Sequence, residues 1–145
     1  MLNQCACSPL RRLTRRITII YDQHLLPHEI TISQYSLLAN VGRLGPIANL
    51  RLAAEMGMER STLSRAIQPL LKAGWIAMVD LPAGERIDKR SFALVLTVAG
   101  KAKWDTAYPN WQQAQEEINT LLGEQVSQQL LGVINSAYEK LQQAA

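Results

Sequence analysis

The sequence predicts a mainly α-helical chain with one small β-hairpin, on three observations. Apolar residues recur through most of the chain at the spacing of about 3.6 residues that marks an amphipathic helix. Two short apolar runs, residues 75–81 and 91–97, have the length of strands and flank a nine-residue loop. Glycine and proline fall between these segments, at positions where turns favour them.

Two helices are expected before the middle of the chain. The first spans residues 9–26, with Ser8 as its N-cap, and Pro27 ends it. The second runs from Ser33 to about Val41. Each carries its apolar residues on one face, as an amphipathic helix does.

Two shorter helices joined by a glycine-centred turn follow. The first covers residues 47–56, and the second begins at Glu59 or Ser61 and ends at Gly74. This is the outline of a helix-turn-helix. Pro69 lies inside the second helix, where it removes a backbone donor and is expected to bend the second half.

Helical periodicity returns at Val98, after the hairpin. Pro109 should either kink this helix or, with residues 106–110, interrupt it. A last helix follows Gly123 and extends to about Leu141. The whole order therefore predicts a helix-turn-helix with an adjoining β-hairpin, between helical ends.

Composition excludes several classes of protein. The 145 residues suffice for one domain, and no apolar run reaches the length of about 18 residues that a membrane helix needs. The N-terminal stretch lacks the order of a signal peptide, so we expect a cytoplasmic protein with no membrane association. Cys5 and Cys7 are too close in the sequence for a disulfide between them to stabilise a fold, which excludes a disulfide scaffold.

Charge is unevenly distributed along the chain. The net charge is +3, but residues 43–103 carry ten Lys and Arg against five Asp and Glu, a net charge of +5, and residues 104–145 carry −4. A basic middle favours a polyanionic partner. An ordinary solvated surface has similar charge, so the arrangement of residues must decide.

The second helix of the helix-turn-helix carries candidate DNA contacts. Such a helix lies in the major groove with its N-terminal residues at the base edges. Leu63 and Ile67 are expected to face the core, which leaves polar residues pointing outward. Arginine suits guanine, glutamine suits adenine, and short hydroxyls suit phosphates or bases, although Ser61 and Thr62 alone could be helix caps. The candidates are Arg60, Ser61, Thr62, Ser64, Arg65 and Gln68.

The loop of the hairpin, residues 82–90, is basic and carries the second set of candidates. An arginine at the tip of such a loop can enter the minor groove of A·T-rich DNA, which is narrow and negative. Asp88 is unexpected there; it could hold a neighbouring arginine by a bidentate pair, or serve solubility alone. The candidates are Arg86, Asp88, Lys89 and Arg90.

Four segments, residues 33–35, 52–76, 88–90 and 96–115, occur in one order along nearly the whole chain. Together they resemble the MarR family of bacterial regulators. The Asp-x-Arg of the loop and the Leu-Thr-x-x-Gly after the last strand are specific in combination. The resemblance implies a winged helix-turn-helix homodimer on a pseudo-palindromic operator, with Asp88 and Arg90 in the family's wing roles. Pro69 departs from the pattern and puts the contacts beyond Arg65 in doubt.

We therefore expect one domain over residues 1–145, with a winged helix-turn-helix at about 32–100 and dimerisation helices at about 8–28 and 98–145. A C₂ dimer would bury the apolar residues of the terminal helices, while packing on the same subunit is the alternative. These residues are Trp104, Tyr108, Trp111, Val126, Leu130, Ile134 and Leu141.

Thiol oxidation is one candidate signal. Cys7 lies at the start of the first helix, where the helix dipole favours a thiolate, and Cys5 is its neighbour. The spacing of Cys7 and Tyr21 resembles the organic-hydroperoxide-sensing branch of the family, although no later cysteine exists to form a disulfide between subunits. The alternatives are incidental cysteines, or a metal site shared with His24 and His28 across a dimer.

A small aromatic acid is the other candidate signal, in a pocket near Arg15, Tyr21 and Tyr35, where the arginine can pair with a carboxylate. No catalytic constellation is evident, so we expect no enzyme, no cofactor and no metal. The sequence predicts a DNA-binding transcriptional regulator, a repressor released by a small ligand or by thiol oxidation. The alternatives are a winged-helix protein–protein adaptor and an architectural DNA-binding protein without a sensor.

Overall fold

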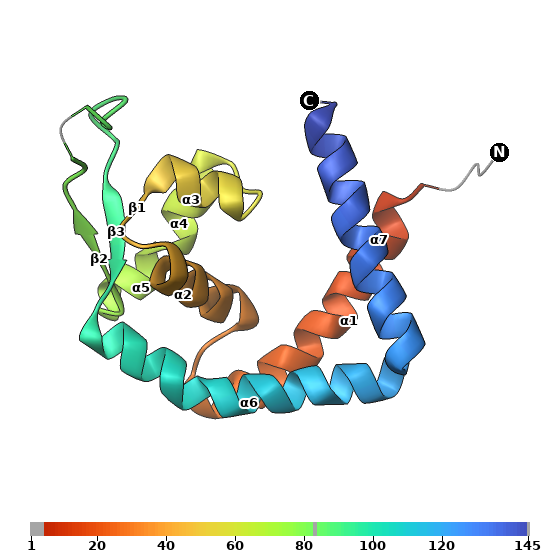
Figure 1. Ribbon diagram of the computed structural model, residues 1–145. Coiled ribbons are helices and arrows are strands. Elements are labelled where there is room, and N and C mark those ends of the chain that lie inside the picture. Colours follow the sequence, from red (N-terminus) through yellow and green to blue (C-terminus); the bar gives the residue numbers. More distant parts are fainter. Residues whose placement is uncertain (1–4, 83, 145) are drawn as a thin grey trace. The chain divides into compact units, whose positions relative to one another are not determined.

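The structure is a computed structural model that describes residues 5–82 and 84–144. Its contacts divide the chain into two compact units. A winged-helix unit extends from Leu25 to Pro109, and a helical unit consists of the residues up to His24 and from Asn110 onward. The long helix α6 (Val98–Leu122) contributes residues to both units (Figure 1).

The winged-helix unit contains the predicted helices and hairpin, with one additional strand. In Figure 1 the hairpin of β2 and β3 (green) stands beside the group formed by α2, α3, α4 and α5. The elements are a 3-10 turn (Leu26–His28), α2 (Ile32–Leu44), β1 (Ile47–Ala48), α3 (Asn49–Glu55), α4 (Arg60–Ala66), α5 (Gln68–Lys72), β2 (Ile76–Val79) and β3 (Ala93–Leu96).

The additional strand is β1, and it corrects the predicted helix over residues 47–56. Ile47 lies opposite Leu94 and Ala48 opposite Ala93, so that the antiparallel sheet has the order β1-β3-β2. Ile47 is buried, and its side chain joins the core from the sheet. A two-residue strand has no periodicity of its own, which is why the apolar pattern could not separate it from the helix that follows.

The boundaries of the first two helices also differ from the prediction. α1 (Cys7–Leu25) begins before Ser8, so Ser8 lies inside the helix and is not its N-cap. Pro9 permits this because the first turn of a helix has no intrahelical partners for its N–H groups. α2 begins one residue earlier than predicted, after a capping box in which Gln34 N donates to Thr31 Oγ1 and Thr31 N donates to Gln34 Oε1.

The two helix-internal prolines act differently. Before Pro69 the chain breaks at Ile67, where α4 ends and α5 begins, so the single predicted helix is divided into two short helices. α6 continues through Pro109, so an interruption over residues 106–110 is wrong. One missing backbone donor is tolerated in a helix of 25 residues because complete turns continue on both sides.

The junction between β3 and α6 explains the Leu-Thr-x-x-Gly segment. The Thr97 hydroxyl donates to Gly74 O at 2.6 Å and accepts from Gly100 N at 3.0 Å, so it caps α6. Thr97 N also donates to Trp75 O at 3.0 Å. A Cβ on Gly100 would lie 1.9 Å from Trp75 O, so no side chain fits at this position.

The helical unit consists of α1, the second part of α6 and α7 (Glu124–Gln143). Tyr21 stacks on Trp111 with ring centroids 6.4 Å apart, and Asn110 Nδ2 donates to His24 O at 3.0 Å. His24 Nε2 lies 2.6 Å from Glu117 Oε2, so the end of α1 is held against α6 at several points. Within the residues that the structure describes, no helix has the length and apolar character needed to cross a membrane.

We predict that Gly100→Ala destabilises the protein by about 1–3 kcal/mol, because backbone must move to admit the methyl group. Urea denaturation measures the change. Gly132→Ala on α7 is the matched control, since a Cβ there meets nothing within 4 Å, and it should be neutral or stabilise by up to about 1 kcal/mol. Equal stability of Gly100→Ala and the wild type would contradict the close approach of Gly100 to the Trp75 carbonyl oxygen.

Candidate nucleic-acid interface

α4 presents a polar face on the side opposite the core. Leu63 and Ile67 are buried, as expected, and the polar residues between them point outward. Gln68 is exposed as well, but its Nε2 donates to Ser64 O at 3.1 Å, which attaches its amide to the break between α4 and α5. The exposed residues of α4 are Ser61, Thr62, Ser64 and Arg65.

Arg60 differs from these residues because its guanidinium is used inside the protein. Nη1 donates to Asp88 Oδ2 at 2.8 Å, and Nη2 donates to Asp88 Oδ1 at 3.0 Å. The two side chains are 22% and 37% exposed, so the pair is partly shielded from water. Asp88 thus forms the bidentate pair that the sequence suggested, but with Arg60 of α4. The pair ties the wing, residues 80–92, to the first residue of α4.

The pair also controls the ionisation of Asp88. Hydrogen bonds from Arg60, and next from the Arg90 backbone N–H at 2.8 Å, hold the pKa of the Asp88 carboxyl well below its usual range. Asp88 in turn raises the pKa of Arg60. A lowered carboxyl pKa stabilises the folded state above the unfolded value of about 3.9, and this contribution is lost as the pH falls through the folded pKa. Both groups are therefore charged throughout the neutral range.

Two buried polar residues that the sequence analysis missed hold the wing from within. Ser91 Oγ accepts from Ile87 N at 3.2 Å and Asp88 N at 3.1 Å. Asn49, at the start of α3, donates to Arg90 O at 3.1 Å and accepts from the backbone N of residue 92 at 3.3 Å. Asparagine at a helix start and serine near a strand are ordinary residues, so no sequence signal marked them.

The basic residues of the wing divide into two groups. Arg86 folds back, with Nε donating to Asp88 O at 3.1 Å and Nη2 to Lys89 O at 3.2 Å. Lys89 and Arg90 are exposed, and the Arg90 side chain is 78% exposed with only a 3.6 Å approach to the Asp88 carboxylate. Arg86 therefore stabilises the loop through these hydrogen bonds, while the side chains of Lys89 and Arg90 extend from the loop into solvent.

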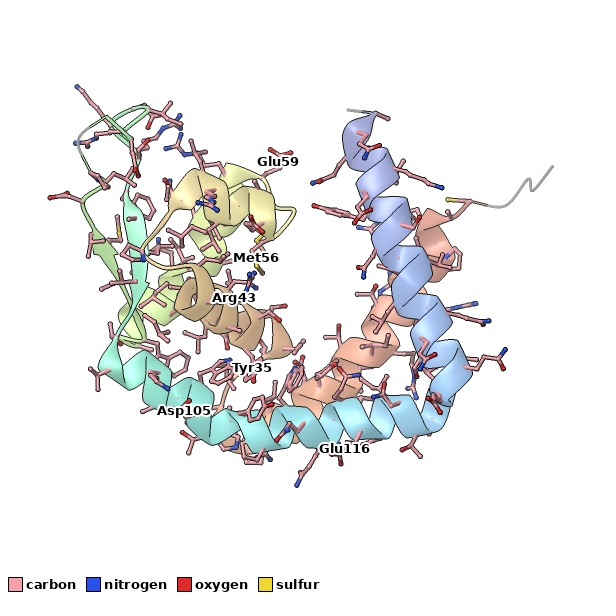
Figure 2. All side chains as sticks on the ribbon, in the orientation of Figure 1. Tyr35, Arg43, Met56, Glu59, Asp105 and Glu116 are labelled. Carbon is pink, nitrogen blue, oxygen red and sulfur yellow. The ribbon has the colours of Figure 1, made fainter. Side chains whose placement is uncertain are left out.

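A hollow opens between α4 and the wing. Ser61, Ser64 and Arg65 line it from α4, and Lys89 and Arg90 line it from the wing. Among the described residues that line it, Glu59 is the acidic one; it directly precedes α4 and is labelled in Figure 2. Exposed cations and hydroxyls around one hollow suit the phosphates of a polyanion.

The two cysteines lie at the N-terminal end of α1, and both are exposed. Hydrogen bonds from the backbone N–H of Ser8, and next of Cys7, lower the pKa of the Cys5 thiol. Cys5 is the near neighbour of Cys7, the residue that the sequence indicated as the candidate sensor. The Tyr21 hydroxyl donates a hydrogen bond to Gln115 Oε1, and burial raises the pKa of Tyr21.

The residues of the predicted ligand pocket belong to different units. Arg15 and Tyr21 lie on α1 in the helical unit, and Tyr35 lies on α2 in the winged-helix unit. Tyr35 is buried and stacks on Trp104 at 5.8 Å, and burial raises its pKa. The rings of Trp104 and Tyr108 have centroids 5.1 Å apart, so these two residues, which the sequence assigned to the dimerisation helices, pack within the winged-helix unit.

A separate hollow of about 450 Å³ lies in the winged-helix unit, between α2, β3 and the first part of α6. Its lining is mostly apolar, with Arg43 (Figure 2) and Lys101 as its cations. Arg43 Nη2 donates to Asn40 Oδ1 at 3.0 Å. Trp104 Nε1 is buried without a hydrogen-bond partner among the described residues. The sequence analysis missed this hollow because its walls come from three separate segments.

For the metal site considered at Cys5, Cys7, His24 and His28, the described part of the chain offers no support: no three His, Cys, Asp or Glu side chains within it are grouped closely enough to hold an ion.

Comparison with known families extends these observations. Residues 30–87 match the model described as the MarR family. The matched segment begins just before α2 and includes Arg60 and the hairpin as far as Ile87. Over this segment the chain is similar to the MarR family. No curated protein sequence matches it.

Solved transcriptional regulators have a similar fold over nearly the whole chain. The M. tuberculosis regulator MosR, in complex with DNA, is 28% identical, with a TM-score of 0.75 over 94% of this chain and 98% of that one. The repressor CouR, bound to a 23-mer DNA duplex, is 21% identical, with a TM-score of 0.80 over 94% of each chain. NadR, in complex with 4-hydroxyphenylacetate, is 18% identical, with a TM-score of 0.72 and the same coverage.

We predict that Asp88→Asn loosens the wing, because the neutral amide cannot form two charge-assisted hydrogen bonds with Arg60. Hydrogen–deuterium exchange at neutral pH should become several-fold faster over residues 84–91, while the core helix α2 keeps its protection. Asp105→Asn is the control, since Asp105 pairs with Lys101 on the surface of α6. Unchanged exchange in the wing of Asp88→Asn would show that the pair does not order it.

Proposed function

We propose that the protein is a sequence-specific, DNA-binding transcriptional repressor that acts as a homodimer on a pseudo-palindromic operator. The observation that carries this proposal is the hollow shared by the exposed face of α4 and the outward cations of the wing. MosR, the 28% identical regulator, was solved in complex with DNA. A protein–protein adaptor would have no need to expose Arg65, Lys89 and Arg90 around one hollow.

In this proposal α4 enters the major groove and the wing reaches the adjacent minor groove. Arg65 reads a base edge, and the hydroxyls beside it contact phosphates or bases. Lys89 and Arg90 contact the DNA from the wing. Arg60 and Arg86 are positioning residues, because their guanidinium groups already bind within the protein.

Dimerisation is proposed from the apolar surface of α7. A surface helix normally keeps its large apolar residues on the covered side, whereas α7 leaves many of them in water. A second copy of the chain, paired by a two-fold axis, would cover this surface and present two α4 helices to one DNA face. The exposed apolar residues are Val126, Leu131, Val133, Ile134, Tyr138 and Leu141.

A small aromatic acid is proposed as one releasing signal, in the hollow between α2, β3 and α6. Its apolar walls suit a ring, and Arg43 can pair with a carboxylate. The site first expected around Arg15, Tyr21 and Tyr35 is the alternative for the same ligand.

Oxidation is proposed as the second releasing signal. Cys5 and Cys7 are both exposed, and the lowered pKa of Cys5 increases the fraction of the nucleophilic thiolate. Attack of that thiolate on a peroxide oxygen gives a sulfenic acid and releases the other peroxide oxygen as water or an alcohol. The resulting change at the start of α1 is then proposed to shift the protein away from its DNA-binding state.

We predict that Arg65→Ala weakens binding to the DNA upstream of the protein's own gene by about 1–3 kcal/mol per half-site. Binding to random duplex should weaken less, because a base contact acts only on the specific sequence. Fluorescence anisotropy over a salt series measures both affinities. Arg12→Ala removes an equal charge from exposed α1 and should leave the preference between the two DNAs unchanged.

Two results would contradict the proposal that the protein binds duplex DNA and that Arg65 contacts a base. Equal weakening on specific and random DNA would make Arg65 a phosphate contact. A wild-type protein whose binding does not fall with salt would not be a duplex-DNA binder, since each neutralised phosphate contributes about −0.9 to the log–log slope.

We predict that the two releasing signals separate in two variants. The Cys5→Ser/Cys7→Ser protein should stay on DNA when hydrogen peroxide is added, yet be released by 4-hydroxyphenylacetate, used as the probe acid. Arg43→Gln should show the reverse. Gel shift measures release. Release of both variants by both agents would contradict the two proposed sites.

A further inference from the structure

One apolar side chain of the wing is not explained by packing. Ile87 is 75% exposed, although the residues on both sides of it bind within the protein. Isolated exposed apolar residues are common on protein surfaces, so exposure alone assigns no role. What distinguishes Ile87 is the loop that carries it.

Three sets of contacts hold Ile87 in this position. Its backbone N–H donates to Ser91 Oγ at 3.2 Å. The preceding Arg86 is fixed to the carbonyls of Asp88 and Lys89, and the following Asp88 is fixed to Arg60. The loop is therefore closed by its own hydrogen bonds, and the Ile87 side chain cannot turn inward without breaking them.

The neighbours of Ile87 indicate what covers it. Lys89 and Arg90 extend from the same loop, and Arg90 continues into the hollow shared with α4. A partner that satisfies both the cations and the isoleucine must offer phosphates next to apolar surface. The minor groove does this, because deoxyribose C–H groups form its walls between the phosphates, and aliphatic side chains are used there by other DNA-binding proteins.

We propose that Ile87 is a DNA-contacting residue of the wing, which packs against the sugar walls of the minor groove beside Arg90. This inference rests on the proposed DNA-binding function. It implies that the wing contributes an uncharged contact as well as cations. Such a contact adds affinity without neutralising a phosphate, so it leaves the salt dependence of binding unchanged.

The test compares Ile87→Ser with Ile87→Leu and with Val98→Ser. Val98 is 90% exposed at the first residue of α6, so it matches the chemical change away from the wing tip. Ile87→Ser should bind the wild-type DNA site several-fold more weakly with the same salt slope, while the other two variants bind as the wild type does. Hydroxyl-radical footprinting should show that Ile87→Ser loses sugar protection at the flanks of the site.

Each other outcome overturns the inference. Wild-type affinity and footprint in Ile87→Ser show that Ile87 does not touch DNA. An equal loss in Val98→Ser shows a general effect of the substitution, and a reduced salt slope in Ile87→Ser shows that it acts through the cations. If the wild type binds no duplex at all, the proposed function itself fails, whereas the preceding outcomes leave that function in place.

Discussion

The bidentate pair between Arg60 and Asp88 is the constraint on which the geometry of the site depends. It joins the first residue of α4 to the wing, two segments that are 28 residues apart in the chain. A guanidinium and a carboxylate fit each other in a planar, two-bonded geometry, so the pair restricts orientation as well as distance. Ser91 and Asn49 complete the arrangement, and the wing is held before any DNA is present.

This constraint changes how the basic charge of the chain is used. The middle segment carries ten Lys and Arg, but two arginines at the site, Arg60 and Arg86, donate their hydrogen bonds to other groups of the protein. Arg65, Lys89 and Arg90 remain at the hollow. Preordered cations lose less conformational freedom on binding, which is the advantage of using Arg60 and Arg86 as supports.

The sequence predicted most elements whose signals are local. The turn after α3 and the outward face of α4 each depend on residues within one or two turns of the chain. Two local signals failed, since Ser8 is not an N-cap and α6 is not interrupted over residues 106–110. The other failures depend on distant partners: β1 exists because it pairs with β3, and Asp88 meets an arginine of another helix. The hollow beside Arg43 likewise joins three segments, so neither periodicity nor spacing could reveal it.

The most direct test of the account is a double-mutant cycle on DNA affinity with Arg60→Gln, Asp88→Asn and the double variant. If the pair positions the wing, each single substitution breaks the same interaction. The double variant should then bind no more weakly than the weaker single variant. If Arg60 instead contacts DNA directly, Arg60→Gln lowers the DNA affinity by the same factor in the wild type and in Asp88→Asn. Strictly additive losses would therefore contradict the central claim.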